Sequence, residues 1–439
     1  MTGSGFVNFW RRVGLWALRR AGKKQTAPER LATLSEVQTS VLKNMGKEDA
    51  ELLREYAAQT TAICVRRLRP RDQVRVIVGG ASRALKQVDR HHVYHACASL
   101  SDLVRIHPRM IDGASFNARS NDERPLVVGP WLMEVGFELL YWIPYLRAQI
   151  AALGIAKDRV IAVSRGGADL WYADIAGRYL DVLDVMTPHE FHEWTSTVEG
   201  TTANRKPFMA GPFETEILER VLNAAGIDDY QFILPSAMYG LLRNVWRSRF
   251  GAHRLDRHLT PARLQVPPPV KLPFKGPYVA VKFYNSLTFP DAPETRRLAL
   301  AVVRGLANRS HVVLLSNPAR LDDHHSLGFA DVEGPFRVFD ASSLYSPRDN
   351  LAVQTALVAG AQSLHGTYGG FSYLGPLLGV DTFAYTANFD FTLTHLDLAW
   401  TMFEALKAGH LAVVPAAQGL HLFAEAEAAP RNPKSGAAA

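Results

Sequence analysis

The stretch AGAQSLHGTYGGFSYLGPLLGVDTFAY, residues 359–385, places a glycine-rich loop between two apolar segments. The residues before the loop predict a short buried strand, and those after it predict a helix followed by a second strand. Strand, loop, helix and strand in this order indicate a parallel α/β sheet. The loop would then lie at the carboxyl end of a strand, where open sheets of this kind bind their ligands.

Alternating strand and helix patterns extend on both sides of this stretch and form two similar runs. The first begins at about residue 125, and the second begins with the strand at 278–284. Between them the segment LQVPPPVKLPFKGP, residues 264–277, is typical of an interdomain linker because proline interrupts regular structure. We therefore expect an α/β fold of two Rossmann-like doubly wound lobes facing a cleft, with an N-terminal helical extension. The expected divisions are the helical extension at 1–120, the first lobe at 121–265, the second lobe at 266–425 and a disordered tail at 426–439.

Composition sets broad limits on the class of protein. The chain has 439 residues, of which 47% are hydrophobic and 21% are charged, as in soluble globular proteins. Its net charge of +7 is modest and its basic residues concentrate near the start, which favours a local anionic partner over nucleic acid. Two cysteines without a ligand pattern indicate a reducing compartment. With no apolar run of membrane-spanning length and no signal-peptide pattern, we expect a cytoplasmic protein.

Residues 6–24, FVNFWRRVGLWALRRAGKK, combine an aromatic side and a basic side at helical spacing. A helix that lies in the interface of an anionic membrane needs this combination. The same pattern also suits a helix that docks on its own protein, and amphipathicity alone does not separate the two. The sequence thus leaves both a peripheral position on the inner face of a membrane and an internal contact open.

The glycine-rich loop from His365 to Ser372 is the first candidate for a ligand site. Its glycines, among them Gly366, Gly369 and Gly370, let the backbone approach a phosphate, and the following helix would add amides and a favourable dipole. Thr367 and Ser372 would add hydroxyl donors. A steric turn is the alternative, since the loop matches neither GxxxxGK[ST] nor GxGxxG.

Two further strand ends in the same half carry polar residues. Lys282 lies inside an apolar strand and suits a diphosphate if its side chain leaves the strand end; otherwise it would be an edge-strand residue in a salt bridge. Asn285 follows that strand, and Ser316 ends the next one. All three are predicted to contact the donor side of a substrate.

The first half offers the candidate acids and bases. Glu134 falls between a strand and a helix, where it could act as a general base or pair with the helix dipole, and Asp169 is a second candidate base. Ser164 and Arg165 at the next strand end would bind an acceptor, with Glu138 as an acceptor contact or a buried structural acid. The cluster LDDHHS, 321–326, is interpreted as a solvated loop, so we expect no metal and no cofactor.

These segments resemble the GT-B superfamily of glycosyltransferases. The resemblance rests on YVAVKFY, on NLAVQTALVAGAQSLHGTYGGFSYLGPLLGV and on the helix from His395. GPWLMEVGFELLYWIPYLR also resembles the first strand, loop and helix of bacterial surface-polysaccharide transferases. In that superfamily the second lobe binds the nucleotide-sugar donor through such a loop, and the first lobe binds the acceptor and often supplies the base. The acidic residue with which many retaining members hold the donor is not found here.

The resemblance implies a glycosyltransferase that takes a nucleotide-sugar donor and a saccharide or lipid-linked acceptor. Donor contact would fall on the loop glycines, Thr367 and Ser372, with Lys282 as a cationic partner, and Glu134 would be the base. The missing acidic residue favours an inverting, metal-independent displacement. A polysaccharide pyruvyl transferase and a noncatalytic sugar- or nucleotide-binding protein are the alternatives on the same fold.

Overall fold

The structure is a computed structural model that describes residues 115–201, 212–246, 258–317, 326–327, 329, 332, 335–388 and 393–420. Within 195–201 and 240–246 the backbone alone is described, apart from Leu242. The predictions for the 6–24 helix, for the acidic and histidine-containing segment at 321–325 and for the 426–439 tail lie outside the described residues. In the described part, no helix is both long enough and apolar enough to cross a membrane.

The first sheet has four parallel strands in the order β3-β2-β1-β4. The strands are β1 (Leu126–Val128), β2 (Val160–Ser164), β3 (Arg178–Asp181) and β4 (Gln231–Ile233). Two parallel strands that follow one another in the chain need a crossover connection, and helices supply it here. These are α7 (Val135–Phe137), the π-helical segment η3 (Glu138–Trp142), α8 (Ile143–Leu153), α9 (Asp169–Tyr172), α10 (Pro188–Thr201) and α11 (Pro212–Ala224), with α12 (Pro235–Trp246) after β4.

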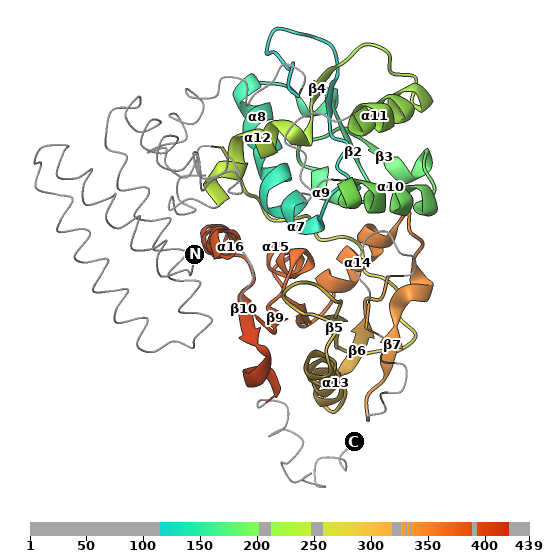
Figure 1. The fold of residues 1–439 in the computed structure, drawn as a ribbon, viewed down its shortest axis with the longest axis vertical. Helices are drawn as coiled ribbons and strands as arrows, with labels where there is room; N and C mark the ends of the chain where they lie inside the picture. Colours follow the sequence, from blue (N-terminus) through green and yellow to red (C-terminus); the bar gives the residue numbers. More distant parts are fainter. Residues whose placement is uncertain are drawn as a thin grey trace, which may run out of the picture. The chain divides into compact units, whose positions relative to one another are not determined.

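Alternation along the strands decides which helices cover each face of this sheet. Val127, Ile161 and Val163 belong to one core cluster with side chains of α10 and α11. Their neighbours in the strands point to the opposite face, because successive side chains alternate. Figure 1 shows α10 and α11 on one side of the sheet and α8 and α12 on the other. Ser164, at the carboxyl end of β2, therefore lies next to Val163 but faces the side of η3 and α8.

The second sheet has six parallel strands in the order β10-β9-β8-β5-β6-β7. If β5 to β10 are numbered 1 to 6 and the sheet is read from β7, the order is 3-2-1-4-5-6, that of dinucleotide-binding Rossmann folds, and it reverses direction between β5 and β8. The strands are β5 (Tyr278–Lys282), β6 (His311–Leu314), β7 (Val338–Asp340), β8 (Leu364–Thr367), β9 (Thr382–Thr386) and β10 (Leu411–Pro415). The helices are α13 (Pro293–Ala307), α14 (Asn350–Ala359), α15 (Leu374–Leu377) and α16 (Leu393–Ala405), with the 3-10 turn η8 (Gly370–Tyr373) before α15.

The central strand β5 shows how the second core orients the polar residues. Val279, Val281 and Phe283 pack in one cluster with α13, including Leu298 and Val302. Lys282 stands between two of these positions, so its side chain leaves the opposite face, toward α14. Two parallel sheets, each flanked by helices, confirm the expected α/β class.

Several elements differ from the expectation. The apolar spacing of ADLWYADIAGRYL, residues 168–180, indicates one helix, but α9 ends at Tyr172 and Arg178–Asp181 forms β3. The next segment, DVLDVM at 181–186, has the pattern of a short strand, but its residues Val182–Asp184 form a 3-10 turn. Gly177 lies between α9 and β3, and its backbone packs against Asp158 so closely that an added Cβ would lie 2.7 Å from the Cα of Asp158. β4, β10 and α10 were not expected, whereas the linker 264–277 has neither helix nor strand, as predicted.

Candidate functional site

The carboxyl ends of β5 and β8 meet where the second sheet reverses its strand order. Gly366 of β8 pairs with Lys282 of β5. A Cβ at Gly366 would lie 2.1 Å from the carbonyl oxygen of Lys282, so the two backbones approach closely only because this residue is glycine. Gly366 therefore serves strand pairing and is not part of the loop. β8 continues to Thr367, so His365, Gly366 and Thr367, which were expected in the loop, belong to the strand.

Lys282 is buried at this edge, at 8% exposure. Its ammonium donates to the carbonyl oxygen of Leu315 at 2.9 Å and to the side-chain oxygens of Asn317 and Gln354, both at 2.8 Å. The ring of Phe371 covers the same nitrogen, 4.7 Å from its centroid. β5 is a central strand, which rules out the edge-strand alternative for this lysine. The positive charge thus lies directly beneath a residue of the glycine-rich loop.

We expect Lys282→Met to lower the free energy of unfolding by about 1–3 kcal/mol, because three buried oxygens would lose their donor. Chemical denaturation followed by fluorescence measures this change. Lys275→Met, at an exposed position shortly before β5, is the matched control. Its free energy of unfolding should stay within about 0.5 kcal/mol of the parent's. Equal losses in both variants would show that the buried bonds do not stabilise this edge.

The loop hydroxyls hold the loop itself. Thr367 donates to the carbonyl oxygen of Tyr284 at 2.7 Å and accepts from its amide at 3.0 Å. Ser372 donates to the carbonyl oxygen of Gly369 at 2.6 Å. Both side chains are buried, at 2% and 4% exposure. In this structure they fix the backbone of the loop, and a direct contact with a donor remains a prediction for them.

The loop amides are arranged differently. No described residue accepts a hydrogen bond from the backbone N–H groups of Gly369, Gly370 or Phe371. Successive amides in a turn of this kind form a concave site for anions. The helix after the loop should attract an anion less strongly than predicted, because Gly370–Tyr373 is a 3-10 turn and α15 has only four residues, so the helix dipole is small. The backbone amides of Gly369, Gly370 and Phe371 are therefore the candidate anion site.

His365 lies within β8 and not in the loop. Its imidazole stacks on Phe383 with 4.8 Å between ring centroids, and its Nδ1 and Nε2 hydrogen-bond with the hydroxyls of Tyr385 and Ser363. Burial lowers the pKa of His365 to about 4. A neutral imidazole buried among aromatic rings contributes packing, and the structure gives it no open face toward a phosphate.

His365 should make the protein less stable in mild acid. The unfolded imidazole takes up a proton as the pH falls through 6.5, whereas the folded one, with its pKa near 4, resists protonation. The neutral imidazole contributes fully to the free energy of unfolding above pH 6.5. About 3 kcal/mol of that free energy is lost as the pH falls toward 4. In urea titrations at pH 7 and pH 4.5, His365→Phe should therefore lose less stability on acidification than the parent. Identical losses would contradict the assignment.

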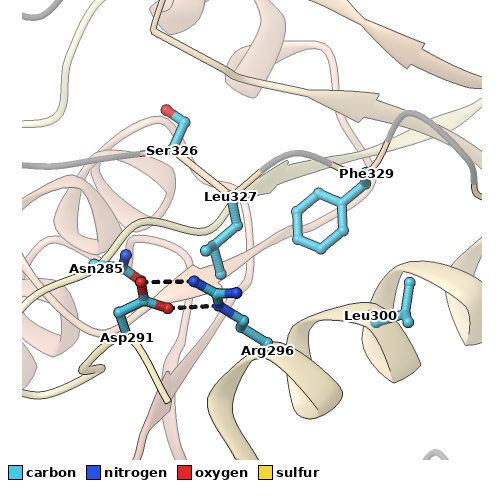
Figure 2. A pocket seen from close by; sticks show the side chains of 7 residues that line it. All are labelled: Asn285, Asp291, Arg296, Leu300, Ser326, Leu327 and Phe329. Carbon is cyan, nitrogen blue, oxygen red and sulfur yellow. Dashed lines mark hydrogen bonds and ion pairs between the residues drawn. The ribbon is translucent and has the colours of Figure 1, made fainter. Parts of the chain in front are cut away.

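Asn285 and Ser316 occupy the neighbouring strand ends. Asn285 lines a pocket of about 510 Å³ with residues of α13 and of the chain after β6, where Asp291 and Arg296 form a two-point ion pair (Figure 2). Its buried Oδ1 has no hydrogen-bond partner among the described residues. Ser316 lies beyond β6 and donates to Asp340 at 2.9 Å. The side chain of Ser316 is thus engaged with Asp340, although its neighbours Leu315 and Asn317 both bind Lys282. Asn285 lies three residues beyond the end of β5.

Glu134, the first candidate base, lies next to the glycine-rich loop. It is the exposed residue before α7, and its side chain makes no capping hydrogen bond. Two residues later, Gly136 packs backbone to backbone on Gly370: a Cβ on Gly370 would lie 2.5 Å from the nitrogen of Gly136. The structure therefore brings the Glu134 segment of the first half to the loop of the second.

Asp169, the second candidate base, lies at a different contact. It is exposed at the start of α9, two residues from Trp171, whose Nε1 donates to the hydroxyl of Thr355 in α14 at 3.0 Å. Three residues before Asp169, the carbonyl oxygen of Gly166 accepts from the amide of Leu351 at 2.7 Å. Asp169 is thus placed near α14, and Glu134 near the loop after β8.

Ser164, Arg165 and Glu138 bind one another. Glu138 is fully buried; its Oε1 accepts from Ser164 at 2.6 Å and from Tyr172 at 2.7 Å, and its Oε2 accepts from Arg165 at 3.2 Å. Burial raises the pKa of Glu138, and the charge of Arg165 opposes that shift. With Ser164 also fully buried, the geometry does not support acceptor contact by these two residues, and Glu138 matches the structural alternative.

Sequence reasoning missed the residues that join the two halves. Tyr141 of η3 and His395 of α16 share a hydrogen bond of 2.6 Å, and Trp171, Thr355 and Gly136 make the contacts described above. Only Gly136 carried a signal, as a glycine inside an otherwise helical pattern. In the part of the chain that the structure describes, no three His, Cys, Asp or Glu side chains are grouped as metal ligands.

No protein-family model matches the sequence, and no curated protein matches it. Among solved structures, the glycosyl transferase family 9 protein from Veillonella parvula DSM 2008 is 11% identical, with 72% of this chain and 92% of that chain covered and a TM-score of 0.39. E. coli ADP-heptose lps heptosyltransferase II is 14% identical, with 70% and 100% covered and a TM-score of 0.36. A putative UDP-N-acetylglucosamine 2-epimerase from Listeria monocytogenes is 12% identical, with 70% and 87% covered and a TM-score of 0.31.

Glycosyltransferases are thus among the structures to which this chain is similar. The fold class itself rests on the strand order of the two parallel sheets.

Proposed function

We propose that this chain is a glycosyltransferase that moves a sugar from a nucleotide-sugar donor to a hydroxyl of a saccharide or lipid-linked acceptor. The observation that carries the proposal is the run of amides at Gly369, Gly370 and Phe371, which have no acceptor among the described residues and lie where the second sheet reverses its order. Sheets of this topology bind nucleotides at that point, and successive loop amides bind phosphate oxygens. The buried ammonium of Lys282 adds positive charge beneath the same loop.

The proposed reaction is a single displacement that inverts the anomeric carbon and needs no metal. Glu134 takes the proton of the acceptor hydroxyl while that oxygen forms a bond to the anomeric carbon. The bond from this carbon to the phosphate oxygen breaks, and its electron pair leaves with the nucleoside diphosphate. The loop amides stabilise the charge that develops on the leaving phosphate. The proximity of Gly136 to Gly370 supports this division of roles between the halves.

A panel of nucleotide sugars tests the class of reaction. The full chain is incubated with each donor and with saccharide and lipid-linked acceptors, and release of nucleoside diphosphate and glycosylated product is measured. Release with product supports the proposal. Nucleotide binding without turnover would favour a noncatalytic binding protein, and transfer of a pyruvyl group in place of a sugar would favour the pyruvyl transferase alternative.

We also propose that the enzyme works in the cytoplasm at the inner face of a membrane, through residues 6–24. The support is the aromatic and basic pattern of that segment. The full chain should co-sediment with vesicles that contain anionic lipid, and a chain lacking residues 1–24 should remain in the supernatant. Equal sedimentation of both forms would contradict the membrane role.

A further inference from the structure

A partly buried arginine, Arg165, connects two segments of the first half. Its Nη1 donates to Oε2 of Glu138 at 3.2 Å, and its Nη2 donates to the carbonyl oxygen of Met133. Its side chain is 11% exposed, and that of Glu138 is 0% exposed. The planar fork of a guanidinium can hold a carboxylate and a carbonyl oxygen at the same time. Arg165 thereby fixes the peptide group that directly precedes Glu134.

The carboxylate of Glu138 has a fixed position of its own. Its second oxygen accepts from Ser164 at the end of β2 and from Tyr172 at the end of α9. Glu138 also begins the π-helical segment, and its amide donates to the carbonyl oxygen of Glu134 at 3.2 Å. Removing one partner of a buried charge pair is costly, so this cluster holds one arrangement. Both ends of the Met133–Glu138 segment are therefore attached to the same group of side chains.

The residues that follow Arg165 dock on the second half. Gly166 and Gly167 have φ angles of +68° and +75°, which favour glycine. Gly166 accepts from the amide of Leu351 at the start of α14. One turn along that helix, Gln354 accepts from Lys282 at the donor edge. Contacts thus run without interruption from the Glu134 segment through Arg165 to the edge where β5 and β8 meet.

From these contacts we infer that Arg165 is a positioning residue, which with Glu138 sets the place of the Glu134 backbone relative to the glycine-rich loop. The inference rests on the proposed function, in which Glu134 is the base. Arg165 touches neither donor nor acceptor in this role. Its loss should lower turnover without weakening nucleotide binding, because a displacement of the base by about 1 Å is enough to reduce the rate strongly.

Arg165→Lys tests the inference because lysine keeps the charge but lacks the fork that reaches both partners. In the full chain, kcat should fall by roughly 10- to 100-fold while the dissociation constant of the nucleoside diphosphate, from calorimetry, stays unchanged. Hydrogen exchange should also become faster at the amide of Glu138, which bonds to Glu134. If Arg165→Lys does not fold, Glu138→Gln weakens the same pair and is measured in the same way.

Arg147→Lys is the matched control. Arg147 also bridges a carboxylate and a backbone carbonyl, those of Asp174 and Thr260, and its side chain is 12% exposed. It lies on α8, away from the Glu134 segment. This variant should keep its kcat and its exchange at Glu138.

Two results would overturn the inference: kcat and exchange unchanged in Arg165→Lys, or equal losses in both arginine variants. If the parent protein transfers no sugar from any donor, the proposed function fails, and the exchange measurement still decides the positioning role. Exchange at Glu138 that is equal in the two variants would then overturn it, and faster exchange in Arg165→Lys alone would support it.

Discussion

Replacing Glu134 with glutamine should lower kcat of sugar transfer by roughly 10²- to 10⁴-fold, the usual contribution of a general base. Glutamine has nearly the same shape but cannot take the proton of the acceptor hydroxyl. Glu134 is exposed and makes no capping hydrogen bond, so the fold should not change. Nucleotide affinity should also persist, because the amides that would hold the diphosphate belong to the second half.

Asp169→Asn is the matched control for this prediction. Asp169 is also exposed at the start of a helix of the first half, but it lies near α14 and not near the loop after β8. Steady-state kinetics on both variants, with thermal melts to check folding, separate the two candidate bases. A large loss in Asp169→Asn with little change in Glu134→Gln would assign the proton transfer to Asp169.

Gly366→Ala should lower the free energy of unfolding by about 3 kcal/mol, toward the upper end for an overpacked core. The added methyl would lie 2.1 Å from the carbonyl oxygen and 2.8 Å from the carbonyl carbon of Lys282. These are backbone atoms of the central strand, which cannot turn aside as a side chain can. The strands would have to separate at Lys282, which also moves the ammonium beneath the loop. Denaturant unfolding measures the loss.

Gly360→Ala provides the comparison in the same half. Its methyl would meet the hydroxyl of Tyr278 at 2.6 Å, which is the movable end of a side chain, and the next atom lies at 3.6 Å. We expect a loss of about 1 kcal/mol or less there. Similar losses at Gly366 and Gly360 would mean that the close approach of β5 and β8 does not limit the fold.

Much of the fold could be predicted because most strands of parallel sheets are buried on both faces. β2 and β5 are apolar over nearly their full length and stand out as short hydrophobic runs. β3 lies at the edge of its sheet and is exposed at Arg178, so it lacks such a run. β10 is likewise an edge strand, and β4 has only three residues. These three strands, β3, β4 and β10, were therefore missed or misread, whereas the short apolar runs of β1 and of the edge strand β7 were predicted.

The candidate site was predictable in its location and less so in its contacts. Residues at the carboxyl ends of parallel strands meet at one edge, so Lys282 and the loop after β8 could be placed together in advance. Whether a hydroxyl faces outward depends on tertiary packing, as Thr367 shows by bonding to Tyr284. The Glu138–Arg165 pair depends on how η3 lies against β2. No spacing in the sequence encodes that contact.

The most direct measurement is a crystal structure of the protein with a bound nucleoside diphosphate. The account predicts the diphosphate at the carboxyl ends of β5 and β8, with its oxygens within hydrogen-bond distance of the amides of Gly369, Gly370 and Phe371. A diphosphate bound elsewhere, or amides of this loop that remain without contact in a complex at saturating nucleotide, would contradict it.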